Sequence, residues 1–242
     1  MKYIKTIIAF FGALAAGALF SSCLDDDDSN SLGRPTALVT VSPGSDGTFV
    51  MYLDDNTVLT PSNMKSSPFK EKEVRALVNY TEDKLLSGKS DIRSVHINWI
   101  DSIRTKQPVA FVEGDDSYGN DPIEIIPDWV TVAEDGYITM RIRTLWGSPS
   151  KVHVINLVTG VNPDDPNEIE LRHNANGDVY GRYGDALVAF NLNGWPGFEG
   201  RAKIKLRWKS FTGERVSEFE LKMRDIASSG EPEKSWFNKN IK

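Results

Sequence analysis

The chain is poor in cysteine and in histidine. Its 242 residues include one cysteine, Cys23, and three histidines. A disulfide needs two thiols, and structural zinc sites are built mainly from Cys and His ligands. The chain therefore can form no internal disulfide and no cysteine-rich metal site. Its fold must be stabilised by its hydrophobic core.

The sequence also lacks the short motifs that identify common enzymes. It contains no HExxH motif, no Gly-x-Ser-x-Gly nucleophile elbow and no phosphate-binding Gly-x-x-x-x-Gly-Lys loop. His96, His153 and His173 fall in or at the end of strand-like segments, and no two have metal-ligand spacing. We interpret all three as structural. A Ser-His-Asp triad stays open, because its members can be distant in the chain.

Two polar loops raise the question of calcium. Residues 164–168 and 174–178 are rich in Asp, Asn and Glu, which supply the oxygen ligands that Ca²⁺ prefers. The Asp-x-Asp-x-Asp-Gly spacing with a distal Glu is missing, however, and Pro163, Pro166 and Gly177 explain both loops as turns. We predict no catalytic residue, no metal and no cofactor.

There is no excess of positive charge. The chain has 28 basic and 34 acidic residues, a formal net charge of -6. Nucleic-acid binding needs a basic surface that neutralises phosphates. We therefore predict no nucleic-acid partner.

The N-terminus has the pattern of a secretion signal. Lys2 and Lys5 precede an uncharged, mostly apolar run over residues 6–20, which is too short for a permanent bilayer span. Ser21 and Ser22 then precede Cys23. Small residues directly before a cysteine are typical of a bacterial lipoprotein. We predict a signal peptide over residues 1–22 and an acylated (palmitate-type) Cys23 that holds the protein to a membrane.

An acidic linker follows the cysteine. Residues 23–33 contain four consecutive aspartates at 25–28. Like charges of this density favour a solvated tether. The same position resembles the surface-export signal of lipoproteins in one lineage of Gram-negative bacteria. We expect the outer membrane with the folded part on the cell surface; a periplasm-facing position is the alternative.

Beyond the linker the hydrophobic pattern has a period of two. Residues 37–41, 49–53, 73–80 and 95–100 alternate in the first half, with turn residues between them. The second half predicts seven strands, over residues 128–133, 137–146, 151–158, 168–173, 186–193, 203–211 and 217–224. This pattern is typical of an all-β protein whose second half is an antiparallel β-sandwich.

A polar, turn-forming segment between Glu113 and Pro122 marks the expected domain boundary. We predict a first domain over residues 34–113, a second over 121–226 and a loosely attached tail over 227–242.

Several segments resemble the NigD-like lipoproteins. The similarity lies in Asn98–Lys106 and, in the second half, in Asp128–Tyr137, Arg143–Gly147, Leu157–Pro166, Leu171–Asp178, Ala189–Leu192 and Arg207–Gly213. The resemblance implies a small N-terminal OB-like β-barrel followed by a C-terminal β-sandwich. The family is named after a gene in a bacteriocin cluster, for whose product an immunity role was proposed. It supplies no catalytic or ligand-binding residues.

Two further residues are candidate sites. Trp195 lies in a Gly-rich loop and is the best candidate for an exposed aromatic that could contact a glycan, although it could also anchor the loop. Asp101-Ser102-Ile103 resembles a short O-glycosylation site, with Ser102 as the acceptor.

Three functions remain open at this stage. The sequence favours a non-enzymatic binding module whose partner is a glycan or a protein. A bacteriocin immunity protein is the alternative, and a hydrolase is the least supported.

Overall fold

The computed structural model describes residues 33–54, 56–83 and 91–224. The predicted signal peptide, Cys23, most of the linker and the predicted tail lie outside these residues. Within the described part of the chain, no helix is both long and apolar enough to span a membrane. These described residues form an all-β structure with a single short 3-10 turn, η1 (Asp116–Tyr118).

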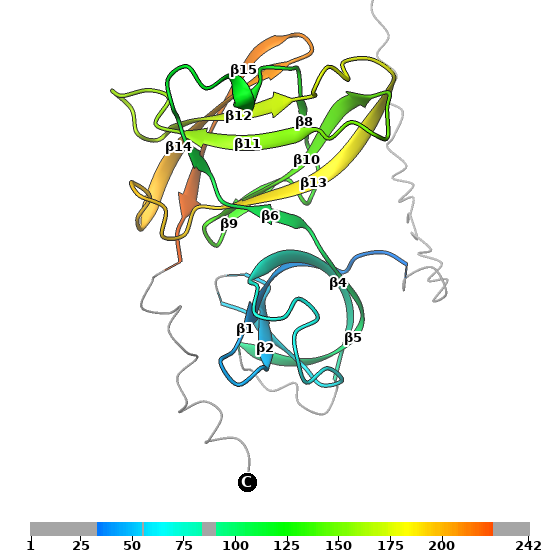
Figure 1. The fold of residues 1–242 in the computed structure, drawn as a ribbon. Coiled ribbons are helices and arrows are strands. Elements are labelled where there is room, and N and C mark those ends of the chain that lie inside the picture. Colours follow the sequence, from blue (N-terminus) through cyan, green and yellow to red (C-terminus); the bar gives the residue numbers. More distant parts are fainter. Residues whose placement is uncertain (1–32, 55, 84–90, 225–242) are drawn as a thin grey trace, which may run out of the picture.

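The N-terminal domain is a closed five-stranded barrel with the strand order β1-β2-β3-β5-β4 (Figure 1). Its strands are β1 (Ala37–Pro43), β2 (Phe49–Tyr52), β3 (Val58–Pro61), β4 (Val74–Glu82) and β5 (Ile92–Ser102). The parallel pairing of β3 with β5 closes the barrel. Val39, Val41, Met51 and Leu59 fill the interior and are fully buried.

Strand β1 is buried on both faces, which the period-two pattern alone does not explain. Val39 and Val41 point into the barrel, whereas Leu38 and Thr40 point out of it and are buried as well. Leu38 packs with Tyr137 of the C-terminal domain, and Thr40 donates a hydrogen bond to Asp135. The outer face of β1 is therefore an interdomain contact.

The C-terminal domain is a sandwich of two five-stranded sheets (Figure 1). One sheet has the order β6-β13-β10-β8, with β9 also paired to β10, and the other has the order β15-β14-β12-β11-β7. The strands of the first are β6 (Arg104–Lys106), β8 (Glu124–Ile126), β9 (Val132–Glu134), β10 (Tyr137–Trp146) and β13 (Arg182–Asn191). Those of the second are β7 (Val109–Ala110), β11 (Val154–Thr159), β12 (Glu168–Asn174), β14 (Arg201–Ser210) and β15 (Gly213–Lys222).

The predicted all-β class and the barrel-plus-sandwich architecture are confirmed, but the sandwich is not wholly antiparallel. Strands β6 and β13, β7 and β11, and β12 and β14 are parallel pairs. The sequence pattern does not distinguish the short strands β6 and β7 from loops, because a segment of two or three residues is too short to show a period.

The domain boundary lies earlier than the segment at residues 113–122. Strand β5 ends at Ser102, and β6 and β7 already belong to the two sandwich sheets. The predicted first domain, 34–113, therefore includes about ten residues of the sandwich. The polar segment is a loop with η1 inside the second domain, where the Tyr118 hydroxyl donates to the Ala110 carbonyl.

One predicted strand is wrong. Residues 128–131 form a turn between β8 and β9, and only Val132–Glu134 of this region is a strand. The Thr131 amide donates to the Asp128 carbonyl at 3.0 Å, and the Trp129 amide donates to the Asp128 carboxylate at 2.6 Å. An Asp side chain that binds the following backbone competes with strand pairing.

Candidate functional site

The residues singled out in the sequence do not meet in one place. Ser102 is exposed at the end of β5, beside the buried Ile103. His96 is exposed on the barrel, whereas His153 and His173 lie together in the sandwich. Cys23 lies outside the described residues. Ser102 thus has the exposure that an O-glycosylation acceptor needs, and the modification itself remains a prediction.

The prediction of Trp195 as an exposed aromatic is wrong. Its ring is partly buried and packs against the sandwich core. The indole Nε1 donates a hydrogen bond to Thr159 Oγ1 at 3.1 Å. Trp195 therefore fixes its loop to the sheet. Among the described residues the exposed tryptophans are instead Trp129 and Trp146, at 55% and 49%.

His153 and His173 form a hydrogen-bonded chain that ends on Asp178. His173 Nδ1 lies 3.0 Å from the Pro122 carbonyl, which can only accept. His173 Nε2 therefore accepts from His153 Nδ1 at 2.9 Å when His173 is neutral. His153 Nε2 faces the Asp178 carboxylate at 3.3 Å. The two rings therefore connect the Pro122 carbonyl to Asp178.

Asp178 is buried at 2% exposure and is held by backbone amides as well. It accepts hydrogen bonds from the amides of Gly147 and Ser148 at 3.0–3.1 Å, and these bonds lower its pKa. A Cβ at Gly147 would lie 2.9 Å from Asp178 Oδ1, so only glycine permits this approach. Burial lowers the pKa of His173. In the part of the chain that the structure describes, no hydroxyl is hydrogen-bonded to either histidine, so we interpret the chain as structural.

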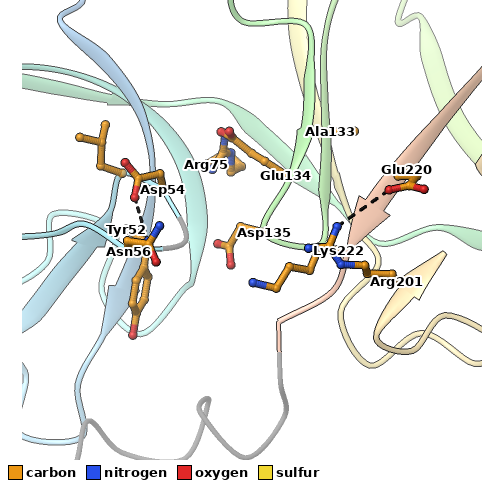
Figure 2. Close-up of a pocket in the computed structure, with 11 residues that line it drawn as sticks. Tyr52, Asp54, Asn56, Arg75, Ala133, Glu134, Asp135, Arg201, Glu220 and Lys222 are labelled. Carbon is orange, nitrogen blue, oxygen red and sulfur yellow. Dashed lines mark hydrogen bonds and ion pairs between the residues drawn. The ribbon is translucent and has the colours of Figure 1, made fainter. Parts of the chain in front are cut away.

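One hollow lies between the two domains and has a volume of about 470 Å³. Figure 2 shows Tyr52, Asp54 and Asn56 of the barrel facing Arg201, Glu220 and Lys222 of the sandwich across it. Its charged groups are engaged with one another, as in the ion pairs of Arg75 with Glu134 and of Arg201 with Glu220. We interpret this hollow as the seam between the domains.

A second hollow, of 440 Å³, lies at one edge of the sandwich, and we call it the edge groove. It is bounded by β6, β10 and β13 on one sheet and by the segment that leads into β11 on the other; Figure 1 shows these strands. Strands β10 and β13 have ten residues each, whereas β11 has six. At this edge of the sandwich β10 and β13 are therefore longer than the strand β11 of the opposite sheet.

The floor of the edge groove is aliphatic, and an aromatic side chain stands at its end. Ile142, Val188 and Ile155 contribute to the floor. Ala186, which pairs with Ile142 and faces the same way, is exposed because nothing lies over it. Trp146 lines the groove, and its ring fits above Gly184, where a Cβ would lie 3.3 Å from Cε3. The result is an apolar concavity of the kind that small ligands occupy.

All the Lys and Arg side chains of the edge groove lack a carboxylate partner. They are Arg104, Lys106 and Lys151, and within residues 33–54, 56–83 and 91–224 none of them forms an ion pair. No Asp or Glu lines the groove. By contrast, Arg141 and Arg143 on the outer face of the same sheet share Asp185.

Groups of three or more His, Cys, Asp and Glu that could hold a metal are absent from the described residues. The two acidic loops have other roles: Glu168 binds Lys205 and Arg207, both at 2.8 Å, and Asp178 binds backbone amides. These contacts account for the carboxylates of Glu168 and Asp178.

Comparison with known proteins agrees with the architecture. The NigD-like N-terminal OB domain matches residues 38–103 and the NigD-like C-terminal beta sandwich domain matches residues 102–223. No curated protein matches the chain.

Similar solved structures come from Parabacteroides and Bacteroides species. A toxin-related protein of Parabacteroides distasonis is 30% identical with a TM-score of 0.61, covering 85% of this chain and 98% of its own. A protein of unknown function from Bacteroides vulgatus is 22% identical with a TM-score of 0.59, covering 78% and 92%. A NigD-like immunity protein of Bacteroides caccae is 22% identical with a TM-score of 0.53, covering 78% and 98%. With both domains matched in order over residues 38–223, the chain belongs to the NigD-like family.

Proposed function

We propose that this chain is a non-enzymatic binding protein, anchored in the outer membrane by the lipid on Cys23, which takes its ligand in the edge groove. The observation that carries the proposal is the edge groove itself: an open apolar concavity with unpaired positive charge on its rim. A folded protein gains nothing in stability from exposing such a surface, so a binding role accounts for it better than a packing role.

The scaffold suits a binding role. Arg75, Arg224 and Tyr137 connect barrel and sandwich through hydrogen bonds and ion pairs, so the two domains form one body. The polar residues near the groove are engaged structurally: the His153–His173 chain holds a loop, and Ser148 and Ser150 bond to each other at 2.9 Å. None of these contacts is the activated nucleophile that a hydrolase needs.

Anchoring and location are tested together on intact cells. External protease should cleave the protein on wild-type cells, and Cys23→Ala should release it from the outer membrane or cause its loss. Cleavage only after the outer membrane has been broken would mean that the aspartates at 25–28 are no export signal and that the protein faces the periplasm. An unacylated wild-type Cys23 by mass spectrometry would contradict the anchor.

Binding is tested separately by native mass spectrometry of the full chain recovered from its own cells. We expect a bound small molecule with the wild type and none with Ala186→Trp, which fills the edge groove without entering the core. An identical bound state in both proteins, or none in either, would contradict a role for the groove.

Immunity is the second candidate, favoured by the similarity to the NigD-like immunity protein of Bacteroides caccae. It requires a toxin as partner, and an acidic chain suits a cationic peptide. Deleting the gene should then sensitise the cells to a bacteriocin. Unchanged sensitivity to the bacteriocins of neighbouring strains would count against this candidate.

A further inference from the structure

We infer that the edge groove binds an anionic amphiphile: a ligand with one carboxylate or similar anionic head and an apolar body. This inference rests on the proposed binding role of the groove and adds the chemical class of the ligand. It starts from the combination of an aliphatic floor with cations that have no partner.

Strand β6 places two cations on the inner face of its sheet. Arg104 and Lys106 pair with Val188 and Phe190 of β13, whose side chains point into the sandwich. Arg104 and Lys106 therefore point to the same side, toward the groove, while Thr105 between them faces the barrel and accepts from the Arg75 amide. Arg104 is exposed and Lys106 is partly buried, and the positive charge that they place at the entrance of an apolar space is complementary to an anion.

Lys106 is held in place but is not neutralised. Its ammonium donates to the Ile155 carbonyl and, at 2.8 Å, to Asn156 Oδ1. An ammonium has three hydrogens, so one has no acceptor among the described residues. Burial and the charge of Arg104 lower the pKa of Lys106. A ligand carboxylate would meet this fixed donor together with the two exposed cations, Arg104 and Lys151.

The other residues that line the edge groove determine which kind of ligand body fits beside the anionic head. A glycan is recognised through many hydroxyl groups, which need amide or carboxylate partners. The groove contains no Asn, Gln, Asp or Glu, and apart from its cations only Thr144, His153 and the indole N–H of Trp146 are polar side-chain groups. The Trp146 N–H already donates to the Ser148 carbonyl. Aliphatic side chains and Trp146 line the remainder, so an alkyl chain or an apolar ring system fits, and a free sugar acid does not.

Inward-facing charges on an edge strand also prevent sheets from pairing edge to edge. That explanation applies to β6, which is an edge strand. It does not account for Lys151, which precedes β11 on the opposite sheet and lines the same groove. The two explanations also differ in their consequences, because loss of an edge guard produces self-association and loss of a ligand site does not.

The test uses the full chain with Cys23→Ala, purified without detergent, and calorimetric titration with decanoate below its micelle concentration. We expect one decanoate per chain and no binding of decyltrimethylammonium or glucuronate. Arg104→Gln/Lys151→Gln should weaken decanoate binding at least about tenfold, since each substitution removes a charge-assisted contact. The matched control Lys65→Gln/Lys72→Gln removes two exposed barrel cations and should leave binding unchanged.

Several results would overturn the inference. Decanoate that fails to bind, that binds no more tightly than glucuronate, or that is insensitive to the groove variant excludes an anionic amphiphile. Self-association of Arg104→Gln/Lys151→Gln without a change in binding would assign these cations to edge protection. If native mass spectrometry instead finds a neutral or cationic ligand that Ala186→Trp removes, the binding function stands and only the ligand class is wrong.

Discussion

The hydroxyl of Tyr137, the first residue of β10, donates a hydrogen bond of 2.5 Å to the Glu73 carboxylate, which directly precedes β4 of the barrel. Tyr137 is fully buried, and burial together with the charge of Glu73 raises its pKa. Glu73 also accepts from Arg224 at 2.8 Å, beside Asp135. These polar groups are desolvated where barrel and sandwich pack together, and their hydrogen-bond partners lie across the seam. The stability of each domain therefore depends on the other.

Arg75 is the best position at which to test this dependence. Its guanidinium is 1% exposed and binds Thr40, Thr139 and Glu134, so it connects barrel and sandwich. Arg75→Met should lower the free energy of unfolding by about 3 kcal/mol and Tm by about 10 °C, because it leaves buried partners unsatisfied. Calorimetry measures both quantities.

The matched control is Arg93→Met, which breaks the exposed pair with Glu82. It should cost about 0.5 kcal/mol. Equal effects of the two substitutions would show that the seam contributes no more than a surface ion pair.

Glu168 should make the sandwich sensitive to acid. Hydrogen bonds from Lys205 and Arg207 lower its pKa to about 2 from the ordinary 4.5. The stability that depends on its charge is fully present above pH 4.5 and is lost as the pH falls toward 2.

Glu168→Gln should therefore reduce stability at neutral pH and flatten the decline of Tm between pH 4.5 and 2. Glu113→Gln, in an exposed loop, is the control and should leave the pH profile as in the wild type. If the Tm of Glu168→Gln declined between pH 4.5 and 2 as steeply as that of the wild type, Glu168 would not be the cause of the acid sensitivity.

His173 should produce a second decline at milder acidity. Burial is the main cause that lowers its pKa below 6.5, and the charge of His153 lowers it further. The hydrogen bond to the Pro122 carbonyl and the charge of Asp121 act in the opposite direction. Above pH 6.5 neutral His173 makes its full contribution to the free energy of unfolding. This contribution diminishes as the pH falls through the pKa that His173 has in the folded state.

Chemical denaturation between pH 7.5 and 5.0 measures this loss. We expect a smaller pH dependence in His173→Gln than in the wild type, and an unchanged one in His96→Gln, whose ring is exposed. A His173 resonance that titrates above 6.5 by NMR would refute the prediction.

Two tryptophans offer a paired test of hydrogen bonding. Of the buried side-chain nitrogen and oxygen atoms in the described residues, only Trp208 Nε1 has no partner, whereas Trp195 Nε1 binds Thr159. Trp195→Phe should therefore destabilise the protein by about 1 kcal/mol more than Trp208→Phe, beyond the change in buried area. Equal costs in urea denaturation would contradict this difference.

The strands that the sequence predicts well are those that alternate over many residues. The expected strand at residues 137–146 matches β10, because one face meets the core along most of its length. Strands β6 and β7 are too short for a period, and their pairing with β13 and β11 depends on tertiary contacts. The boundary was misplaced because the chain passes from barrel to sandwich with no linker, between Ser102 and Arg104.

The candidate site was harder to predict, because it depends on what the fold leaves uncovered. Trp146 ends an alternating segment and Trp195 lies in the Gly-rich loop that follows one, yet of the two only Trp146 is exposed. Arg104 and Lys106 flank Thr105, and this spacing indicates that the two cations lie on the same face of a strand. The sequence alone does not show that this face opens on a groove, since β11 lies about fifty residues away and no local pattern indicates that it is short.

The seam also constrains how such proteins can diversify. Because Arg75 lies in the barrel and its partner Glu134 in the sandwich, joining this barrel to a sandwich without that acid would leave a buried cation without its partner. Recombination between relatives should therefore preserve the pair as one inherited block. Variation can concentrate at the edge groove, where Ala186 and Lys151 are exposed and can change without disturbing the junction.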